Sequence, residues 1–185
     1  MNASFGQCSL YLHPENHKTL KTSVLISELE KIGLIAKPLI AKQMKDKHFY
    51  TGENYLDYIA YMGCAPNLQF KASGDNKNFC FIKVHSYDRK QLIVSKTQAR
   101  PPLCPECKKP VKNWEEKITD RTLFCENCNK TAGIEGYDWR KMGGFAQLFI
   151  EITDVFPKEA VPQPSLLDKL SKITQTKWQF FYSCR

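Results

Sequence analysis

Two pairs of closely spaced cysteines constrain this chain more than any other feature. Cys104 and Cys107 form one C-x2-C pair, Cys125 and Cys128 form a second, and 17 residues separate the pairs. Each pair presents two sulfurs on one side of a tight turn, and 17 residues suffice for one strand out and one strand back. The spacing therefore predicts that the four sulfurs meet around one metal ion.

Zinc is the metal that this ligand set favours, because Zn²⁺ prefers four tetrahedral thiolates. A redox dithiol needs only one such pair, at a strand-to-helix junction. An iron–sulfur cluster or a rubredoxin-like iron is the remaining alternative. With cysteine in all four positions no coordination site stays open for water, so we expect one structural Zn²⁺ and no catalytic metal.

Residues 102–131, about a sixth of the chain, resemble a zinc ribbon. The resemblance implies a small β-hairpin that holds Zn²⁺ between its two cysteine turns. Zinc ribbons occur in transcription factors, ribosomal proteins, polymerases, tRNA-modifying enzymes and purely structural inserts. The motif is therefore specific for the metal and not for the function.

The rest of the chain is predicted to form one α+β domain from residues 1–99 and 133–185, into which residues 100–132 insert as the ribbon. Arg100-Pro101-Pro102 marks the boundary, because proline extends neither a helix nor a strand ladder easily. We expect a mixed sheet and two to three helices, and we expect Trp139 to dock the ribbon on this domain.

Hydrophobic spacing locates the elements of this domain. Strands are expected at 7–12, 34–40, 79–84, 91–95, 145–153 and 178–182. Helices are expected at 20–32, from about 51 to 62, and from Ser165, as N-cap, to 173. The polar segment between 84 and 91 predicts a hairpin that joins the two flanking strands.

The excess of 27 Lys+Arg over 19 Asp+Glu gives a net charge of +8, which favours polyanionic partners, with nucleic acid first. A basic protein without such a partner is the alternative. No signal peptide or membrane-spanning segment is recognised, so we expect a cytoplasmic protein that does not engage a membrane. Its other cysteines are then expected to be free thiols, namely Cys8, Cys64, Cys80 and Cys184.

Two basic clusters are candidate nucleic-acid contacts. The first lies in a predicted loop and comprises Lys42, Lys45 and Lys47. The second lies on the ribbon, with Trp114 as an aromatic platform for bases, and comprises Lys108, Lys109, Lys112 and Arg121. Either cluster is alternatively an ordinary solvated surface.

No catalytic sequence motif is present, so no catalytic residue is assigned. The leading hypothesis is a non-enzymatic zinc protein that binds nucleic acid or acts as a regulatory factor. Alternatively, it is an adaptor or immunity-type factor whose ribbon contacts an acidic protein. A third possibility is an enzyme with structural zinc and an active site assembled from distant residues.

Overall fold

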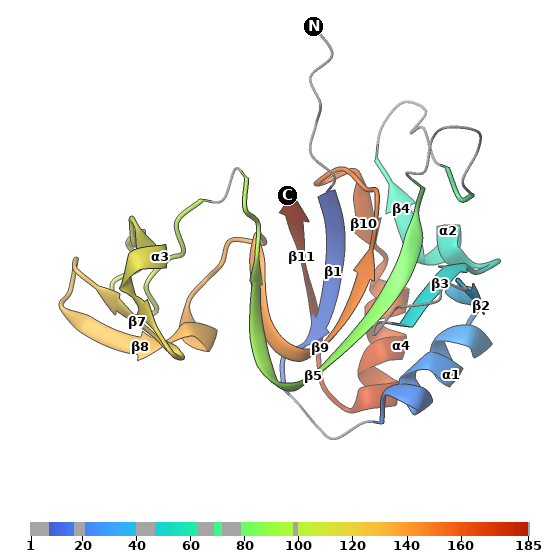
Figure 1. Ribbon diagram of the computed structural model, residues 1–185, viewed down its shortest axis with the longest axis horizontal. Helices are drawn as coiled ribbons and strands as arrows, with labels where there is room; N and C mark the ends of the chain where they lie inside the picture. Colours follow the sequence, from blue (N-terminus) through green and yellow to red (C-terminus); the bar gives the residue numbers. More distant parts are fainter. Residues whose placement is uncertain are drawn as a thin grey trace, which may run out of the picture.

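A six-stranded sheet forms the body of the molecule (Figure 1). The computed structural model describes residues 8–16, 21–39, 47–62, 69–71, 79–97 and 100–184. The strands of this sheet are β1 (Cys8–Pro14), β2 (Ile35–Pro38), β3 (Lys47–Thr51), β5 (Phe81–Val94), β9 (Gly143–Ile152) and β11 (Trp178–Cys184). Their order is β11-β1-β9-β5-β3-β2. All pairs among them are antiparallel, so the prediction of a mixed sheet is wrong.

Two helices cover one face of the sheet, α1 (Thr22–Lys31) and α4 (Pro164–Thr174). Their buried leucines, Leu25 and Leu29 on α1 among them, pack in one cluster with side chains of β1, β5 and β9. Two of the three predicted helices are confirmed, as is the end of α1, where Gly33 has a positive φ of 72°. The predicted N-cap is wrong, because Pro164 already occupies the first turn of α4.

Two other predicted elements are wrong. Residues 79–95 form no hairpin, since β5 runs unbroken and pairs along its length with β9. The polar segment lies where the register shifts between Ser86 and Gln91, so it is a bend within one strand. The helix predicted from about 51 to 62 is a single turn, α2 (Tyr55–Tyr58). It gives way to β4 (Ile59–Tyr61), which pairs with β10 (Ala160–Pro162).

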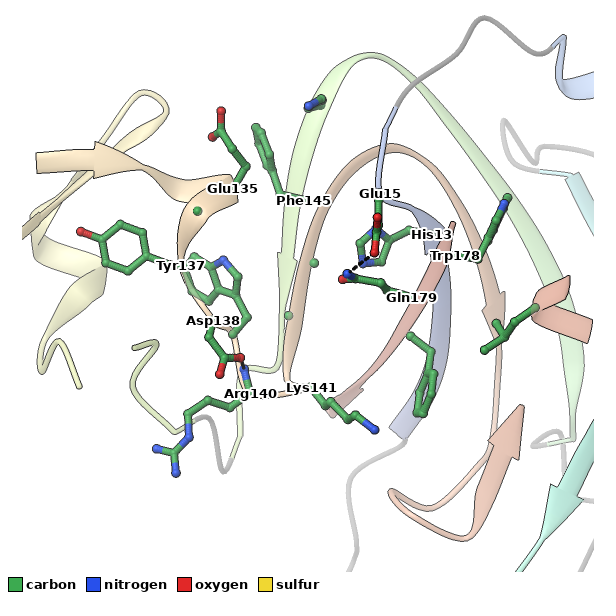
Figure 2. A pocket seen from close by; sticks show the side chains of 17 residues that line it. His13, Glu15, Glu135, Tyr137, Asp138, Arg140, Lys141, Phe145, Trp178 and Gln179 are labelled. Carbon is green, nitrogen blue, oxygen red and sulfur yellow. Dashed lines mark hydrogen bonds between the residues drawn. The ribbon is translucent and has the colours of Figure 1, made fainter. Parts of the chain in front are cut away.

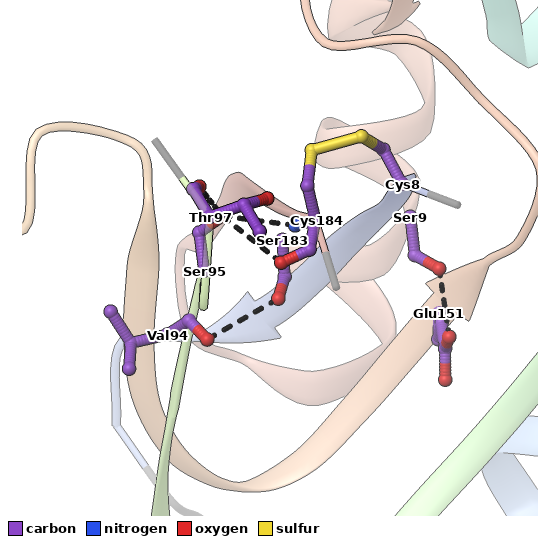
Figure 3. Close-up of a disulfide and its surroundings, with 8 residues drawn as sticks. All are labelled: Cys8, Ser9, Val94, Ser95, Thr97, Glu151, Ser183 and Cys184. Atoms are coloured by element: carbon purple, nitrogen blue, oxygen red, sulfur yellow. Dashed lines mark hydrogen bonds between the residues drawn. A yellow bond between two sulfur atoms is a disulfide. The ribbon is translucent and has the colours of Figure 1, made fainter. Parts of the chain in front are cut away.

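The sheet curls so that the residues just after β5 contact the end of β11, the strand at the edge of the sheet (Figure 3). The Lys96 backbone N–H donates to the Cys184 carbonyl over 3.0 Å. A second core lies inside this fold, where Tyr11 stacks on Phe181 with ring centroids 5.1 Å apart. Gly144 is required there, since a Cβ would lie 2.5 Å from Phe181 Cε1.

Cys8 and Cys184 form a disulfide between the paired strands β1 and β11 (Figure 3). The expectation of free thiols at these two positions is therefore wrong. Cys80 is a buried free thiol, as predicted, and Cys64 lies outside the described residues. Disulfides are typical of proteins in oxidising compartments. This pair therefore does not fit the predicted cytoplasmic location, where thiols are kept reduced.

The cysteines of the two C-x2-C pairs lie in residues 102–139, which we call the cysteine module. It lies at one end of the long axis of the molecule (Figure 1). Its elements are α3 (Trp114–Lys117), β6 (Ile118–Thr119), β7 (Thr122–Cys125), β8 (Lys130–Gly133) and the 3-10 turn Ile134–Gly136. In the described part of the chain, no helix has the length and apolar character needed to cross a bilayer.

Candidate metal centre

The four sulfurs of Cys104, Cys107, Cys125 and Cys128 lie within 4.8 Å of one another. Across the two turns, Cys104 Sγ is 3.7 Å from Cys128 Sγ, and Cys107 Sγ is 3.7 Å from Cys125 Sγ. Sulfurs that surround one Zn²⁺ tetrahedrally at about 2.3 Å are separated by about 3.8 Å. The cluster therefore has the size of a four-thiolate metal site and can hold one ion.

Backbone geometry fixes the two cysteine turns. In the first turn, the Lys108 N–H donates to the Cys104 carbonyl over 3.0 Å, and the Cys104 N–H donates to the Lys109 carbonyl over 3.0 Å. The backbone of Lys108 adopts a positive φ of 57°, which residues other than glycine rarely adopt. In the second turn, the side-chain Nδ2 of Asn127 donates to the Pro110 carbonyl over 3.1 Å. These hydrogen bonds shape both turns around the sulfur cluster.

The close contact of the four thiols opposes their simultaneous ionisation. Desolvation, followed by contact with the neighbouring cysteine sulfurs, raises the pKa of Cys128 to about 12. Desolvation also raises the pKa of Cys125, but backbone N–H groups of Asn127 and Cys128 outweigh it and lower that pKa to about 7. Once one thiol has ionised, its negative charge disfavours ionisation of the next thiol. A divalent ion at the centre removes this conflict.

The module has its own core, and Trp114 is part of it. Trp114 is only 7% exposed and packs edge-to-face against Trp139, with ring centroids 5.0 Å apart. It therefore offers no exposed platform for bases, contrary to the prediction. The same cluster contacts Leu92 and Val94 of β5 and Phe145 of β9, so Trp139 docks the module as predicted. The core of the module thus includes residues beyond 132, the predicted end of the ribbon.

The predicted basic residues of the module are exposed on its surface, namely Lys108, Lys109, Lys112 and Arg121. Two other lysines of the module are neutralised, since Lys130 pairs with Glu106 at 3.3 Å and Lys117 pairs with Glu126 at 2.8 Å. Within the described residues, the four predicted cations take part in no ion pair. Their charge is available to a partner.

The first predicted cluster, that of the predicted loop, does not join this surface. Lys42 and Lys45 lie outside the described residues. Lys47 is exposed on β3, at the opposite end of the long axis from the module (Figure 1). A short ligand on the module therefore does not reach Lys47.

Sequence reasoning did not anticipate a buried polar cluster on the inner side of the folded sheet. Glu151 on β9 is 2% exposed and accepts a hydrogen bond from Ser9 Oγ at 2.8 Å. His85 Nε2 donates to its other oxygen at 2.7 Å, and Lys83 Nζ lies 3.3 Å away. Burial raises the pKa of Glu151, but these hydrogen bonds and the Lys83 charge outweigh it and lower that pKa to about 2.

Comparison of the chain with protein-family models, with curated proteins and with solved structures gave no match. The described residues form a four-cysteine cluster within ligand distance of one ion, on a module with four exposed cations that form no ion pair.

Proposed function

We propose that this chain is a zinc-stabilised nucleic-acid-binding protein without catalytic activity. The four cysteines hold one structural Zn²⁺, because an all-thiolate site at tetrahedral spacing suits zinc and leaves no position for water. The ion fixes the two cysteine turns, the first of which leads into Lys108 and Lys109. Metal binding and folding of the module are thus coupled.

One observation carries the nucleic-acid proposal: four exposed cations of the module form no ion pair in the described residues, although the exposed carboxylates Glu115, Glu116 and Asp120 lie on the same module. The four cations are Lys108, Lys109, Lys112 and Arg121. Unpaired cations gain free energy on a phosphate backbone by releasing condensed counterions. Cations that are already paired, such as Lys130 with Glu106, gain less. Trp114 is buried, so the proposal requires phosphate contacts and no stacking at that residue.

The test measures fluorescence anisotropy of labelled RNA and DNA with the zinc-loaded protein. The module variant replaces the four cations by alanine. A matched control removes four exposed lysines outside the module, Lys21, Lys169, Lys172 and Lys177. We expect the module variant to lose on the order of 10-fold or more in affinity. The control should lose clearly less, although both variants carry the same net charge.

Equal losses in the two variants would show that only net charge matters and would contradict a module interface. The absence of binding by wild type at low salt would also contradict it. In that case, stable co-purification of an acidic protein would favour the adaptor alternative.

A further inference from the structure

A basic cavity of about 420 Å³ is lined in part by the segment that leads from the module into β9. Four cations from three separate parts of the chain line it: Arg100, Arg140, Lys141 and Lys158. Among the described residues, no carboxylate lines it. None of these cations takes part in an ion pair within the described residues. Four like charges around one cavity repel each other unless an anion lies between them.

The backbone holds two of these cations in a turn that normally requires other residues. The Met142 N–H donates to the Trp139 carbonyl over 2.9 Å, which closes a four-residue turn. The central residues, Arg140 and Lys141, have positive φ angles of 56° and 57°. This is the pattern of a type I′ turn, whose central positions favour Asn and Gly. The chain thus has two cationic residues at turn positions where the backbone conformation favours Asn and Gly.

A third cation repeats this arrangement. The Glu159 N–H donates to the Phe156 carbonyl over 3.2 Å, so Pro157 and Lys158 are the central residues of a turn. Lys158 has a positive φ of 72°. Proline followed by a positive φ indicates a type II turn, in which glycine is preferred at the second position. Residues held in rare backbone conformations often cluster at functional sites.

Two of the three described hydroxyl groups that line the cavity are already engaged. Ser95 Oγ donates to the Thr97 carbonyl over 2.7 Å. Tyr182 Oη donates to the Ala160 carbonyl over 2.7 Å. A ligand in this cavity is therefore recognised mainly by cationic donors. That set of donors suits a compact polyanion better than a neutral polar molecule.

We propose that this cavity binds the phosphate group of a phosphate monoester. Guanidinium groups bind phosphate oxygens in pairs, and lysines add point charges around them. A monoester carries close to two negative charges at neutral pH, which matches four cations better than one carboxylate does. This inference does not depend on the proposed function, because the cavity is formed by residues other than the exposed cations of the module.

The rest of the monoester has room in a neighbouring cavity of about 590 Å³, which shares Arg140 and Lys141 with the basic one (Figure 2). Its walls combine aromatic rings, such as Phe145, with carboxylates, such as Glu15 and Glu135. Rings favour a flat substituent, and carboxylates accept hydrogen bonds from hydroxyl or amino groups. A nucleoside monophosphate, free or at the end of a nucleic acid, combines these groups.

The experiment measures binding by calorimetry and thermal shift for three probes. They are inorganic phosphate, a nucleoside 5′-monophosphate, and an oligonucleotide with or without a 5′-phosphate. The variant Arg140→Asn/Lys141→Gly removes two cations and installs the residues that a type I′ turn prefers. We expect it to fold, with an unliganded melting temperature at or above that of wild type, and to bind phosphate on the order of 10- to 100-fold more weakly.

Lys169→Asn/Lys172→Asn is the charge-matched control, since it also removes two cations, but from the exposed side of α4. It should keep wild-type phosphate binding. Tighter binding of the monophosphate than of inorganic phosphate supports use of both cavities. A preference for the 5′-phosphorylated oligonucleotide identifies a nucleic-acid end as the source.

The proposal is wrong if wild type binds none of the phosphate probes, or if the turn variant binds them as tightly as wild type does. Its failure is distinct from failure of the proposed function. The four-cation module variant tests nucleic-acid binding while leaving this cavity intact.

Discussion

Replacing Glu151 by glutamine should remove a buried charge that stabilises the folded state. The carboxylate lies among Ser9, Lys83 and His85 and is 2% exposed. Its pKa falls from an ordinary value of 4.5 to about 2 in the folded protein. At 1.36 kcal/mol for each unit of pKa, this fall corresponds to about 3 kcal/mol of folding free energy.

The sign follows from the lowered pKa. The folded state favours the ionised carboxylate, so the stabilisation is fully present above about pH 4.5 and is lost as pH falls toward about 2. Glu151→Gln should therefore be less stable at pH 7 by about 3 kcal/mol. For a chain of this size, that corresponds to a melting temperature roughly 6–12 °C lower.

The assay is urea unfolding of both proteins at several pH values. The difference between them should be largest at neutral pH and shrink below about pH 4.5. Taking this difference cancels metal loss in acid, which affects both proteins alike. Glu30→Gln on the exposed side of α1 is the control and should change little. Equal stability of wild type and Glu151→Gln at pH 7 would refute the reasoning.

Three further predictions concern the metal, the disulfide and the fold of the sheet. Removing the metal with a chelator should unfold the module first, seen as lost near-ultraviolet circular dichroism from its tryptophans, and one equivalent of Zn²⁺ should restore it. Cys8→Ala/Cys184→Ala opens a link across 176 residues and should cost up to about 5 kcal/mol in urea unfolding. Gly144→Ala should cost about 1–3 kcal/mol, because its Cβ would lie 2.5 Å from Phe181. Gly136→Ala, where the nearest such atom is 3.8 Å away, is its control and should be near neutral.

Local spacing made part of this structure predictable. The four-cysteine cluster follows from two pairs 17 residues apart, because short turns and one hairpin bring the sulfurs together. The helices α1 and α4 follow from apolar residues at helical spacing. In each case the deciding contacts lie within a few dozen residues of one another in the chain.

Features that depend on distant contacts were missed. The polar residues between Ser86 and Gln91 read as a loop, since nothing local shows that β9 pairs on both sides of a bend. The partner of Cys8 lies 176 residues away, so their pairing has no local signal. Trp114 read as a surface aromatic because its partner, Trp139, lies beyond the predicted end of the module.

The basic cavity was missed for the same reason. Arg100, Lys158 and the Arg140–Lys141 pair come from three segments, and none of these segments forms a long basic run. One local signal was present. Asp138-Trp139-Arg140-Lys141 stands before Gly143-Gly144, where a turn into the next strand is expected, but with cations in place of turn-forming residues.

The central claim is that nucleic acid binds the unpaired cations of the zinc-stabilised module. The most direct test is the slope of log affinity against log salt concentration, for zinc-loaded wild type and for the four-cation module variant. If each cation contacts one phosphate, removing all four should make the slope shallower by about 3 to 4. An unchanged slope, or no binding by wild type at low salt, would contradict the account.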